Sequence, residues 1–189
     1  MGKVTLYTGG CRSGKSRLAC QQASRLSEKV CFIATCIPQD EEMKRRVKKH
    51  QEQRPEGWHV IEEPLKVTEA IRTVDRQEFG VVLVDCLTLW VCNLMCQKAR
   101  PVKTEQDIAI EAERLIESAR EYGGDVLFVS NEVGMGIMPD NEIARVYTDL
   151  AGRCNQIIAA GAETVIFIVS GVPLTLKQEQ NNEFVAGNN

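Results

Sequence analysis

The sequence predicts an α/β fold built on a mostly parallel sheet flanked by helices. Two observations support this prediction. Short β-rich segments alternate along the chain with longer segments of helical periodicity. The β-rich segments, such as "VVLVD" and "TVIFIVS", are continuously apolar rather than alternating, which is typical of parallel strands covered on both faces. Together these patterns indicate strand–helix–strand units within one sheet.

The elements follow in order along one domain, predicted at residues 1–176. Strands are expected at residues 3–8, 29–34, 81–85, 125–130 and 164–170, with a short strand around His59 and an edge strand at 171–176. Helices are expected near 15–27, 40–53, 65–75, 104–122 and 140–160. In the last helix apolar residues recur at helical spacing, and Asp140 stands where a cap belongs. The tail at 177–189 has little apolar surface to bury and is expected to be disordered.

Composition excludes several classes of protein. The chain has 189 residues and a formal net charge of −3, which argues against a protein that coats nucleic acid. No apolar run reaches membrane-spanning length, and the first residues lack the pattern of a signal peptide. The eight cysteines form no CxxC pair, and several lie inside apolar segments. We therefore expect reduced core cysteines in a cytoplasmic protein, rather than a zinc site or a disulfide framework.

The segment "GGCRSGKS" (9–16) matches the phosphate-binding pattern G-x-x-x-x-G-K-[S/T]. Its glycines allow backbone N–H groups to surround phosphate oxygens, its lysine reaches the β- and γ-phosphates, and its serine can hold Mg²⁺. It follows a predicted strand and opens a predicted helix, whose positive end favours an anion. The sequence therefore predicts a nucleoside triphosphate site made by Gly9, Gly10, Cys11, Arg12, Ser13, Gly14, Lys15 and Ser16.

Asp85 closes the apolar strand "VVLVD". An acidic residue at this place in a P-loop fold usually positions Mg²⁺. Capping of a helical segment beginning at Leu87 is the alternative.

Three segments follow directly after predicted strands. Ligands of open α/β sheets lie beyond the carboxyl ends of the strands, which points to residues 34–36, 86–88 and 131–141. The last segment, "NEVGMGIMPDN", is longer than a plain connection needs. It is either a surface loop or a contact for substrate.

Both histidines, His50 and His59, lie in a stretch rich in Lys and Arg. In the predicted helix, Met43, Val47 and His50 are spaced four and three residues apart and share one face. His50 could be a packing or capping residue, a metal ligand or a nucleophile. No second His or Cys lies at ligand spacing on that helix, which disfavours a metal. A neutral imidazole can attack phosphorus where nearby cations offset the phosphate charge, so a nucleophilic role stays open beside packing.

The motifs resemble those of adenosylcobinamide kinase/adenosylcobinamide-phosphate guanylyltransferase, a bifunctional family of cobalamin biosynthesis. The resemblance covers about residues 3–176 and is carried by "GGCRSGKSR", "IAT", "DEEM", "HQEQRPEGW", "DCLTLWVCNL", "NEVGMGIMPDNEIAR" and "DLAGRCNQ". The combination of the last two is far more specific than the P-loop.

The resemblance implies a RecA-like P-loop fold and two reactions. The family phosphorylates adenosylcobinamide with ATP or GTP, and then transfers GMP from GTP to the product through a GMP-histidine. His50 and Lys15 would be catalytic, Ser16 and Asp85 would hold Mg²⁺, and His59 would pack. A homotrimer with sites between subunits is also implied, with no nucleic-acid partner and no membrane insertion. Beyond residues 9–16, the implied nucleotide contacts are Ala34, Thr35, Cys36, Gln51, Glu52, Gln53, Arg54, Glu62 and Asp85.

Rival functions make different predictions. A P-loop small-molecule kinase without guanylyltransferase activity would not need His50. A nucleotide-dependent switch is disfavoured because the guanine-reading N-K-x-D motif is missing from the sequence. A RecA-like nucleic-acid motor fits poorly with an acidic chain that has 5% aromatic residues.

Overall fold

The computed structural model describes residues 2–38, 40–52, 55–99 and 101–178. Within helix α2 (Glu41–Glu52), the side chains of Arg46, Lys49, His50 and Glu52 lie outside this description.

One seven-stranded sheet forms the centre of the protein, with the strand order β3-β2-β4-β5-β1-β6-β7. Neighbouring strands from β3 through β6 pair in parallel, and β7 pairs antiparallel with β6. The strands are β1 (Val4–Gly9), β2 (Val30–Ala34), β3 (His59–Glu62), β4 (Val81–Asp85), β5 (Asp125–Val129), β6 (Thr164–Val169) and β7 (Val172–Gln178). The predicted mostly parallel α/β sheet is confirmed.

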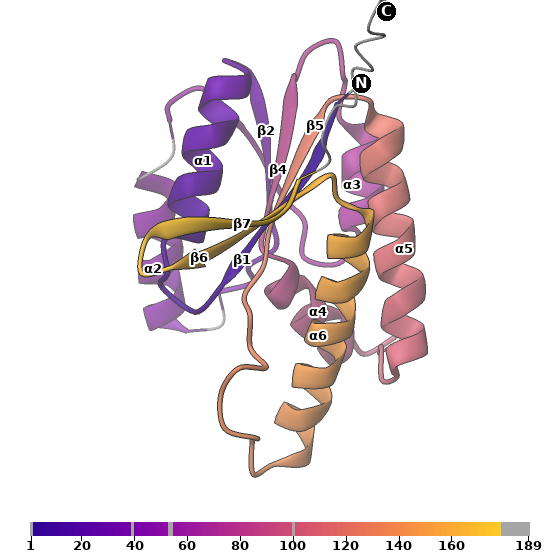
Figure 1. Cartoon of the computed structure of the whole chain (residues 1–189). Helices are drawn as coiled ribbons and strands as arrows, with labels where there is room; N and C mark the ends of the chain where they lie inside the picture. The colour runs from indigo at the N-terminus through magenta and orange to yellow at the C-terminus, as the bar shows by residue number, and fades with distance from the viewer. Residues whose placement is uncertain (1, 39, 53–54, 100, 179–189) are drawn as a thin grey trace, which may run out of the picture.

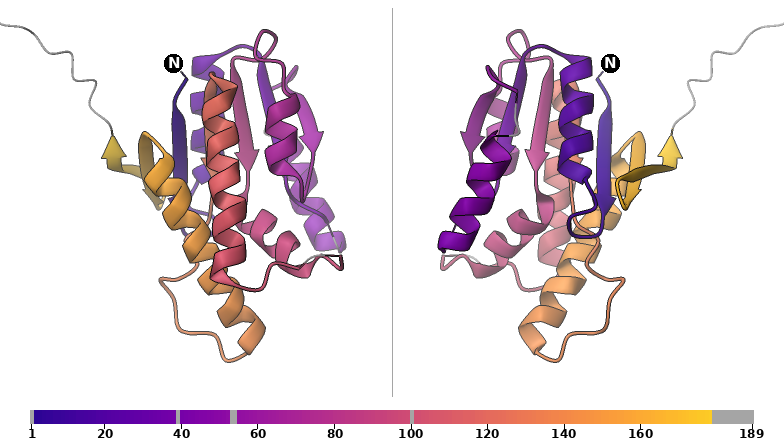
Figure 2. Two further views of the ribbon diagram at one scale, coloured as in Figure 1. Left: turned by 90° about the vertical axis from the view of Figure 1, so that its right-hand side faces the viewer. Right: turned by 90° about the vertical axis from the view of Figure 1, so that its left-hand side faces the viewer.

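Helices cover both faces of the sheet (Figures 1 and 2). On one face, α3 to α6 pack on residues that include Leu6, Ile33 and Phe128. On the other face, Ala19 and Ala23 of α1 pack on strand residues such as Leu83. The two clusters take alternate residues of the same strands, which is why the strands are apolar throughout. Besides α2, the helices are α1 (Lys15–Leu26), α3 (Val67–Thr73), α4 (Leu87–Cys96), α5 (Glu105–Tyr122) and α6 (Glu142–Gly161).

Capping side chains fix the ends of several helices. Thr104 and Asp107 form a reciprocal capping box at the start of α5, and Gly123 ends that helix with φ 71°. At α2, the carboxylate of Asp40 accepts a hydrogen bond from the Met43 backbone N–H at 2.7 Å. The cap of α6 is Asn141, whose side chain accepts from the Ala144 N–H. The expected cap at Asp140 is therefore wrong by one residue.

Two elements differ from the sequence predictions. Helix α4 is missing from the predicted helices, and the sequence points to it only as the segment beginning at Leu87 that Asp85 could cap. Its segment "LTLWVCNLMC" is almost wholly apolar and lacks the amphipathic 3.6-residue period of a surface helix. Strand β7 reaches Gln178, two residues beyond the predicted domain end at 176. Residues 179–189 of the predicted tail lie outside the described part of the chain.

The cysteines are all free, and Cys31, Cys86 and Cys154 are buried core residues. Cys11 and Cys96 are exposed, so the core role predicted for the cysteines holds for only some of them. Among the described residues, no helix is long and apolar enough to cross a membrane.

Candidate active site

The carboxyl ends of five strands form one edge of the sheet. Glu62, Ala34, Asp85 and Val129 stand side by side in register across β3, β2, β4 and β5. Val129 in turn pairs with Tyr7, two residues before the end of β1 at Gly9. The sheet thus places the P-loop and three of the predicted site residues on the same edge, as expected for a parallel α/β sheet.

The P-loop backbone adopts conformations that favour glycine. Gly9 has φ +143°, and a Cβ on it would lie 2.3 Å from the Ile168 carbonyl oxygen. Gly14 has φ 97° in the left-handed region and begins α1. The Ser13 N–H donates to the Gly10 carbonyl at 3.2 Å, and the Gly171 N–H donates to the Ser13 carbonyl at 2.9 Å. The loop is therefore closed on itself and anchored to the β6–β7 turn.

Lys15 points its ammonium group back into the loop. Its Nζ donates to the Gly10 carbonyl at 2.7 Å, and the residue is only 6% exposed. Burial lowers the pKa of Lys15, while Cys86, Cys11 and Asp85 oppose that shift. The first turn of α1 contains no acidic residue. A buried cation at an uncompensated helix N-terminus favours an anion in the loop.

Two buried hydroxyl groups near this loop have no hydrogen-bond partner among the described residues. They are Thr8 Oγ1, at the end of β1, and Ser13 Oγ, inside the loop. A buried hydroxyl without a partner is costly. Ser13 Oγ is therefore a free donor in the loop, and a bound phosphate would offer it an acceptor.

Thr35 joins the ends of β2 and β4. Its hydroxyl donates to the Cys86 carbonyl and accepts from the Cys86 N–H, both at 2.8 Å. Its own N–H donates to the Asp85 carbonyl at 3.1 Å. The Asn93 amide donates to the carbonyls of Thr35 and Pro64 at 2.8 and 3.0 Å. Both hydrogen bonds of the Thr35 hydroxyl therefore go to the Cys86 backbone, and they hold the Asp85–Cys86 peptide in place.

Asp85 ends β4 beside this junction and is half-buried. The N-cap residue of α4 is Cys86, so the alternative in which Asp85 occupies the cap position is wrong by one residue. The peptide bond between the two residues is cis. Burial raises the pKa of the Cys36 thiol, and the carboxylates of Asp85 and Glu62 raise it further. The thiol of Cys36 therefore lies within electrostatic range of both carboxylates at the carboxyl edge of the sheet.

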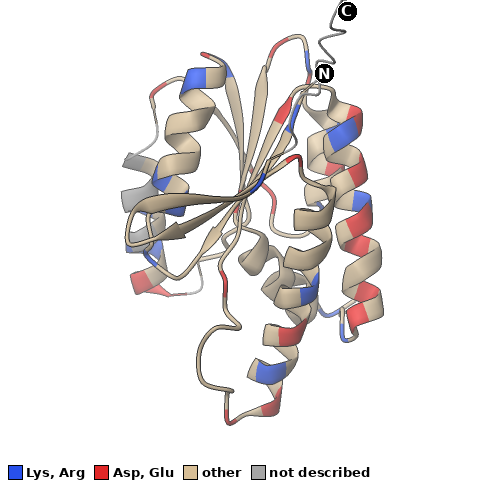
Figure 3. Ribbon diagram, viewed as in Figure 1, with Lys and Arg blue, Asp and Glu red and all other residues tan. Residues whose placement is uncertain are grey.

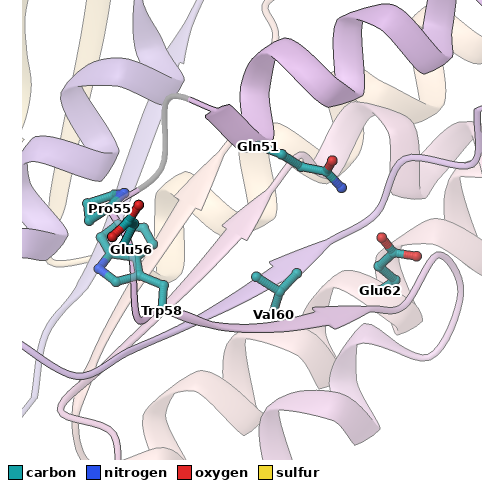
Figure 4. Close-up of a pocket in the computed structure, with 6 residues that line it drawn as sticks. All are labelled: Gln51, Pro55, Glu56, Trp58, Val60 and Glu62. Atoms are coloured by element: carbon teal, nitrogen blue, oxygen red, sulfur yellow. The ribbon is translucent and has the colours of Figure 1, made fainter.

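A pocket lies along the outermost strand β3, between that strand and the end of α2. This pocket has a volume of about 410 Å³. Figure 4 shows Pro55, Glu56 and Trp58 at one end, Glu62 at the other, Val60 between them and Gln51 projecting from the helix. Gln51 and Glu62, two of the expected nucleotide contacts, thus line the same pocket.

Sequence reasoning missed the other four lining residues, Pro55, Glu56, Trp58 and Val60. Trp58, Val60 and Glu62 recur at every second position, so they share one face of an extended segment. This alternation is the sequence signal that could have placed Trp58 and Val60 on the same face as Glu62.

The P-loop and the pocket are well separated. In the strand order, β1 and β3 lie four steps apart, and each step is about 4.8 Å. The two sites are therefore roughly 19 Å apart along the sheet edge.

Some predicted site residues lie outside the described part of the structure. The side chains of His50 and Glu52 are not described, and Gln53 and Arg54 lie outside the described residues altogether. The backbone of His50 is in the last turns of α2. His59 stacks on Phe79 at a centroid distance of 5.3 Å, which confirms its expected packing role.

A hydrogen-bonded network holds the start of the 131–141 loop. Asn155 of α6 accepts from the Ser130 hydroxyl at 2.6 Å and donates to the Asn131 carbonyl at 3.0 Å. The Asn131 amide donates to the Thr88 hydroxyl at 2.8 Å. The next N–H, of Glu132, donates to the Gly9 carbonyl at 2.9 Å. The loop is thereby tied directly to the P-loop, a link that the sequence motifs did not reveal.

The sequence profile of the family described as cobinamide kinase / cobinamide phosphate guanyltransferase matches residues 5–176. The chain belongs to this family. The match covers the P-loop, the α2–β3 pocket and the 131–141 loop, so the site lies wholly within the family domain. The resemblance seen in the motifs is confirmed.

Curated relatives agree with this assignment. The bifunctional adenosylcobalamin biosynthesis protein CobP of Pseudomonas aeruginosa is 41% identical over 174 residues, which cover 92% of this chain and 97% of the relative. The CobU protein of Escherichia coli, which bears the same description, is 38% identical over 182 residues, covering 92% and 99%. That of Salmonella typhimurium is 37% identical, with the same coverage.

Among solved structures, an ATPase domain superposes with a TM-score of 0.54 at 16% identity, covering 87% of this chain and 68% of that one. This likeness supports the predicted RecA-like P-loop fold.

Proposed function

We propose that the chain carries both activities of its family. It phosphorylates adenosylcobinamide with ATP or GTP, and then joins GMP from GTP to that phosphate through His50, releasing pyrophosphate. The observation that carries the proposal is the presence of two separate sites on one sheet. The P-loop with Lys15 is the first, and the pocket beneath the helix that bears His50 is the second.

The kinase half rests on the P-loop. Its backbone N–H groups and Lys15 would bind the β- and γ-phosphates and stabilise the charge that develops during transfer. The acceptor hydroxyl attacks the γ-phosphorus and releases its proton to solvent, a new P–O bond forms, and the bond to the bridging oxygen breaks, leaving a nucleoside diphosphate.

Mg²⁺ is part of this proposal, and Ser16 and Asp85 are the residues that would hold it. A hydroxyl and a carboxylate are hard oxygen ligands of the kind that Mg²⁺ prefers. The electrostatic attraction between Asp85 and Lys15 indicates that this carboxylate lies near the P-loop. When bound, the ion would supply positive charge that offsets the charge of the phosphates.

The guanylyltransferase half uses His50. Its neutral imidazole nitrogen attacks the α-phosphorus of GTP, so that a P–N bond forms while the bond to the bridging oxygen breaks and pyrophosphate leaves. A phosphate oxygen of adenosylcobinamide phosphate then attacks the same phosphorus. The P–N bond breaks, and free histidine is restored. Gln51, Glu52, Gln53, Arg54 and Glu62 are the proposed nucleotide contacts around this step.

Labelled GTP tests the histidine directly. We expect protein incubated with Mg²⁺ and GTP labelled at the α-phosphate to retain label after denaturation, in an acid-labile and alkali-stable adduct. His50→Ala should lose the adduct, and the matched control His59→Ala should keep it, because His59 stacks on Phe79. If the wild-type protein forms no adduct and still phosphorylates adenosylcobinamide, the chain is a kinase alone.

A homotrimer with sites between subunits also belongs to the proposal. The described residues of α2 include no buried side chain, and Met43 and Val47, on the predicted His50 face, are half-buried. A partner subunit against this face would cover them. Light scattering coupled to size-exclusion chromatography measures the mass directly.

We also place the protein in the cytoplasm, since all eight cysteines are free.

A further inference from the structure

Four large apolar side chains are exposed together where the 131–141 loop enters α6. We call them the loop patch: Met135 at 78% exposed, Ile137 at 99%, Met138 at 66% and Ile143 at 70%. Side chains of this kind normally mark a binding surface when they gather on one segment. The earlier residue Val133, by contrast, packs against the main core.

Hydrogen bonds hold the loop at both ends. At its start, the Glu132 N–H donates to the Gly9 carbonyl at 2.9 Å, and the Glu132 carboxylate accepts from the Gly134 N–H at 2.8 Å. At its end, Arg145 donates to the carbonyls of Pro139 and Asp140 at 3.0 and 2.7 Å. The loop patch is therefore presented by a defined backbone that begins at the P-loop.

The middle of this loop, between Glu132 and Asp140, is uncharged. Residues 133–139, "VGMGIMP", contain no ionisable side chain. In Figure 3 the loop extends beyond the carboxyl edge of the sheet and is tan over most of its length. A highly charged ligand would find no partner here, whereas an apolar one would gain contact area.

We propose that the loop patch binds the corrin ring of the adenosylcobinamide acceptor during phosphoryl transfer. The acceptor hydroxyl must reach the γ-phosphate held in the P-loop, so the body of the acceptor has to lie against this edge of the sheet. A corrin ring is a large macrocycle bordered by methyl groups and uncharged amides, which matches a neutral, apolar surface. Methionine side chains adapt to irregular apolar shapes.

The α2–β3 pocket is a poorer place for this ring. It lies roughly 19 Å from the P-loop along the sheet edge, and two of its six lining residues are the carboxylates Glu56 and Glu62. The loop that carries the patch is instead linked to the P-loop by the hydrogen bond from the Glu132 N–H to the Gly9 carbonyl.

The inference rests on the proposed function. Steady-state kinetics of the kinase step test the inference and the proposed function separately. The variant is the double substitution Ile137→Gln and Met138→Gln. Both side chains are exposed, so the fold should tolerate the change. The matched control is Leu26→Gln, an exposed leucine (43%) at the far end of α1, roughly 17 Å along the helix from Lys15.

We expect the double variant to raise the KM for adenosylcobinamide about 10-fold, from the loss of apolar contact area. Its KM for ATP and its yield of GMP-protein adduct from GTP should match the wild type. Leu26→Gln should leave all three unchanged. Equilibrium dialysis with adenosylcobinamide, followed by the visible absorbance of the corrin, should show the same weakening without turnover.

An unchanged KM and an unchanged dissociation constant for adenosylcobinamide would overturn the inference and leave the proposed function intact. A double variant with altered subunit association but unaltered affinity for adenosylcobinamide would assign the loop patch to a second copy of the chain, and would also overturn it. A wild-type protein that does not phosphorylate adenosylcobinamide at all would instead remove the proposed function.

Discussion

The P-loop and the α2–β3 pocket lie on one sheet, but they are built in different ways. The P-loop is closed by its own backbone, anchored to the β6–β7 turn at Gly171 and backed by the buried Lys15. The described residues of α2 include no buried side chain, and in β3 His59, Val60 and Glu62 are exposed.

This difference shows that backbone geometry alone can prepare a phosphate site, whereas the second site is an open surface. An open surface can accept a nucleotide, a partner subunit or both. Changes to the P-loop backbone should therefore alter stability, a change to the Lys15 charge should alter chemistry, and changes at the pocket should alter chemistry alone.

Lys15→Met should have the largest effect and separates function from stability. We expect kcat/KM for phosphorylation to fall roughly 10²- to 10³-fold, because a charge aimed at the transferred phosphate is lost. The melting temperature without nucleotide should not fall. Steady-state assays and thermal unfolding measure the two quantities.

The reason for the second expectation is the pKa of Lys15, which burial lowers. The unfolded chain binds the proton more tightly, so the buried charge lowers stability at neutral pH. In the wild type this cost should lessen as the pH rises through the folded-state pKa toward the ordinary value of 10.5. A melting temperature well below that of the wild type would show that the Gly10 contact outweighs the cost of burial.

Gly9→Ala should destabilise the P-loop side by about 1–3 kcal/mol, because the new Cβ would meet the Ile168 carbonyl oxygen and the backbone has a positive φ. Gly10→Ala is the matched control, since a Cβ there has no atom within 4 Å. Urea unfolding measures both. Equal losses in the two variants would mean that the close approach at Gly9 is relieved at no cost.

Glu62→Gln should have the smallest effect of the three and tests the pocket. Because Glu62 is exposed, the free energy of unfolding should stay within about 0.5 kcal/mol of the wild type. The GTP concentration that gives half-maximal GMP adduct should rise about 10-fold, from the loss of a charged hydrogen-bond acceptor. The KM for ATP in the kinase step should not change. A parallel rise in that KM would mean that the two sites share one nucleotide.

Much of the architecture could be predicted because it depends on local patterns. The apolar runs marked the buried parallel strands, and "GGCRSGKS" marked the loop between β1 and α1. Helix α4 was predicted only as an alternative, because an almost wholly apolar helix has no polar face to reveal its period.

Individual side chains at the site were harder to predict. The resemblance placed Thr35 near the nucleotide, and the structure shows its hydroxyl bonded to the backbone of Cys86, the residue that follows β4. Trp58 and Val60 line the pocket only because β3 lies beside β2 with α2 above it. No local pattern encodes such a neighbour.

The sequence by itself therefore determined the strands, the phosphate loop and the family, because each of these is carried by residues close together in the chain. Tertiary structure alone decided which strand ends meet, where the hydroxyl of Thr35 is bound, and that the 131–141 loop is tied to Gly9. The physical reason is that strand order and loop anchoring depend on packing between distant segments, and their contacts form only when the whole sheet assembles.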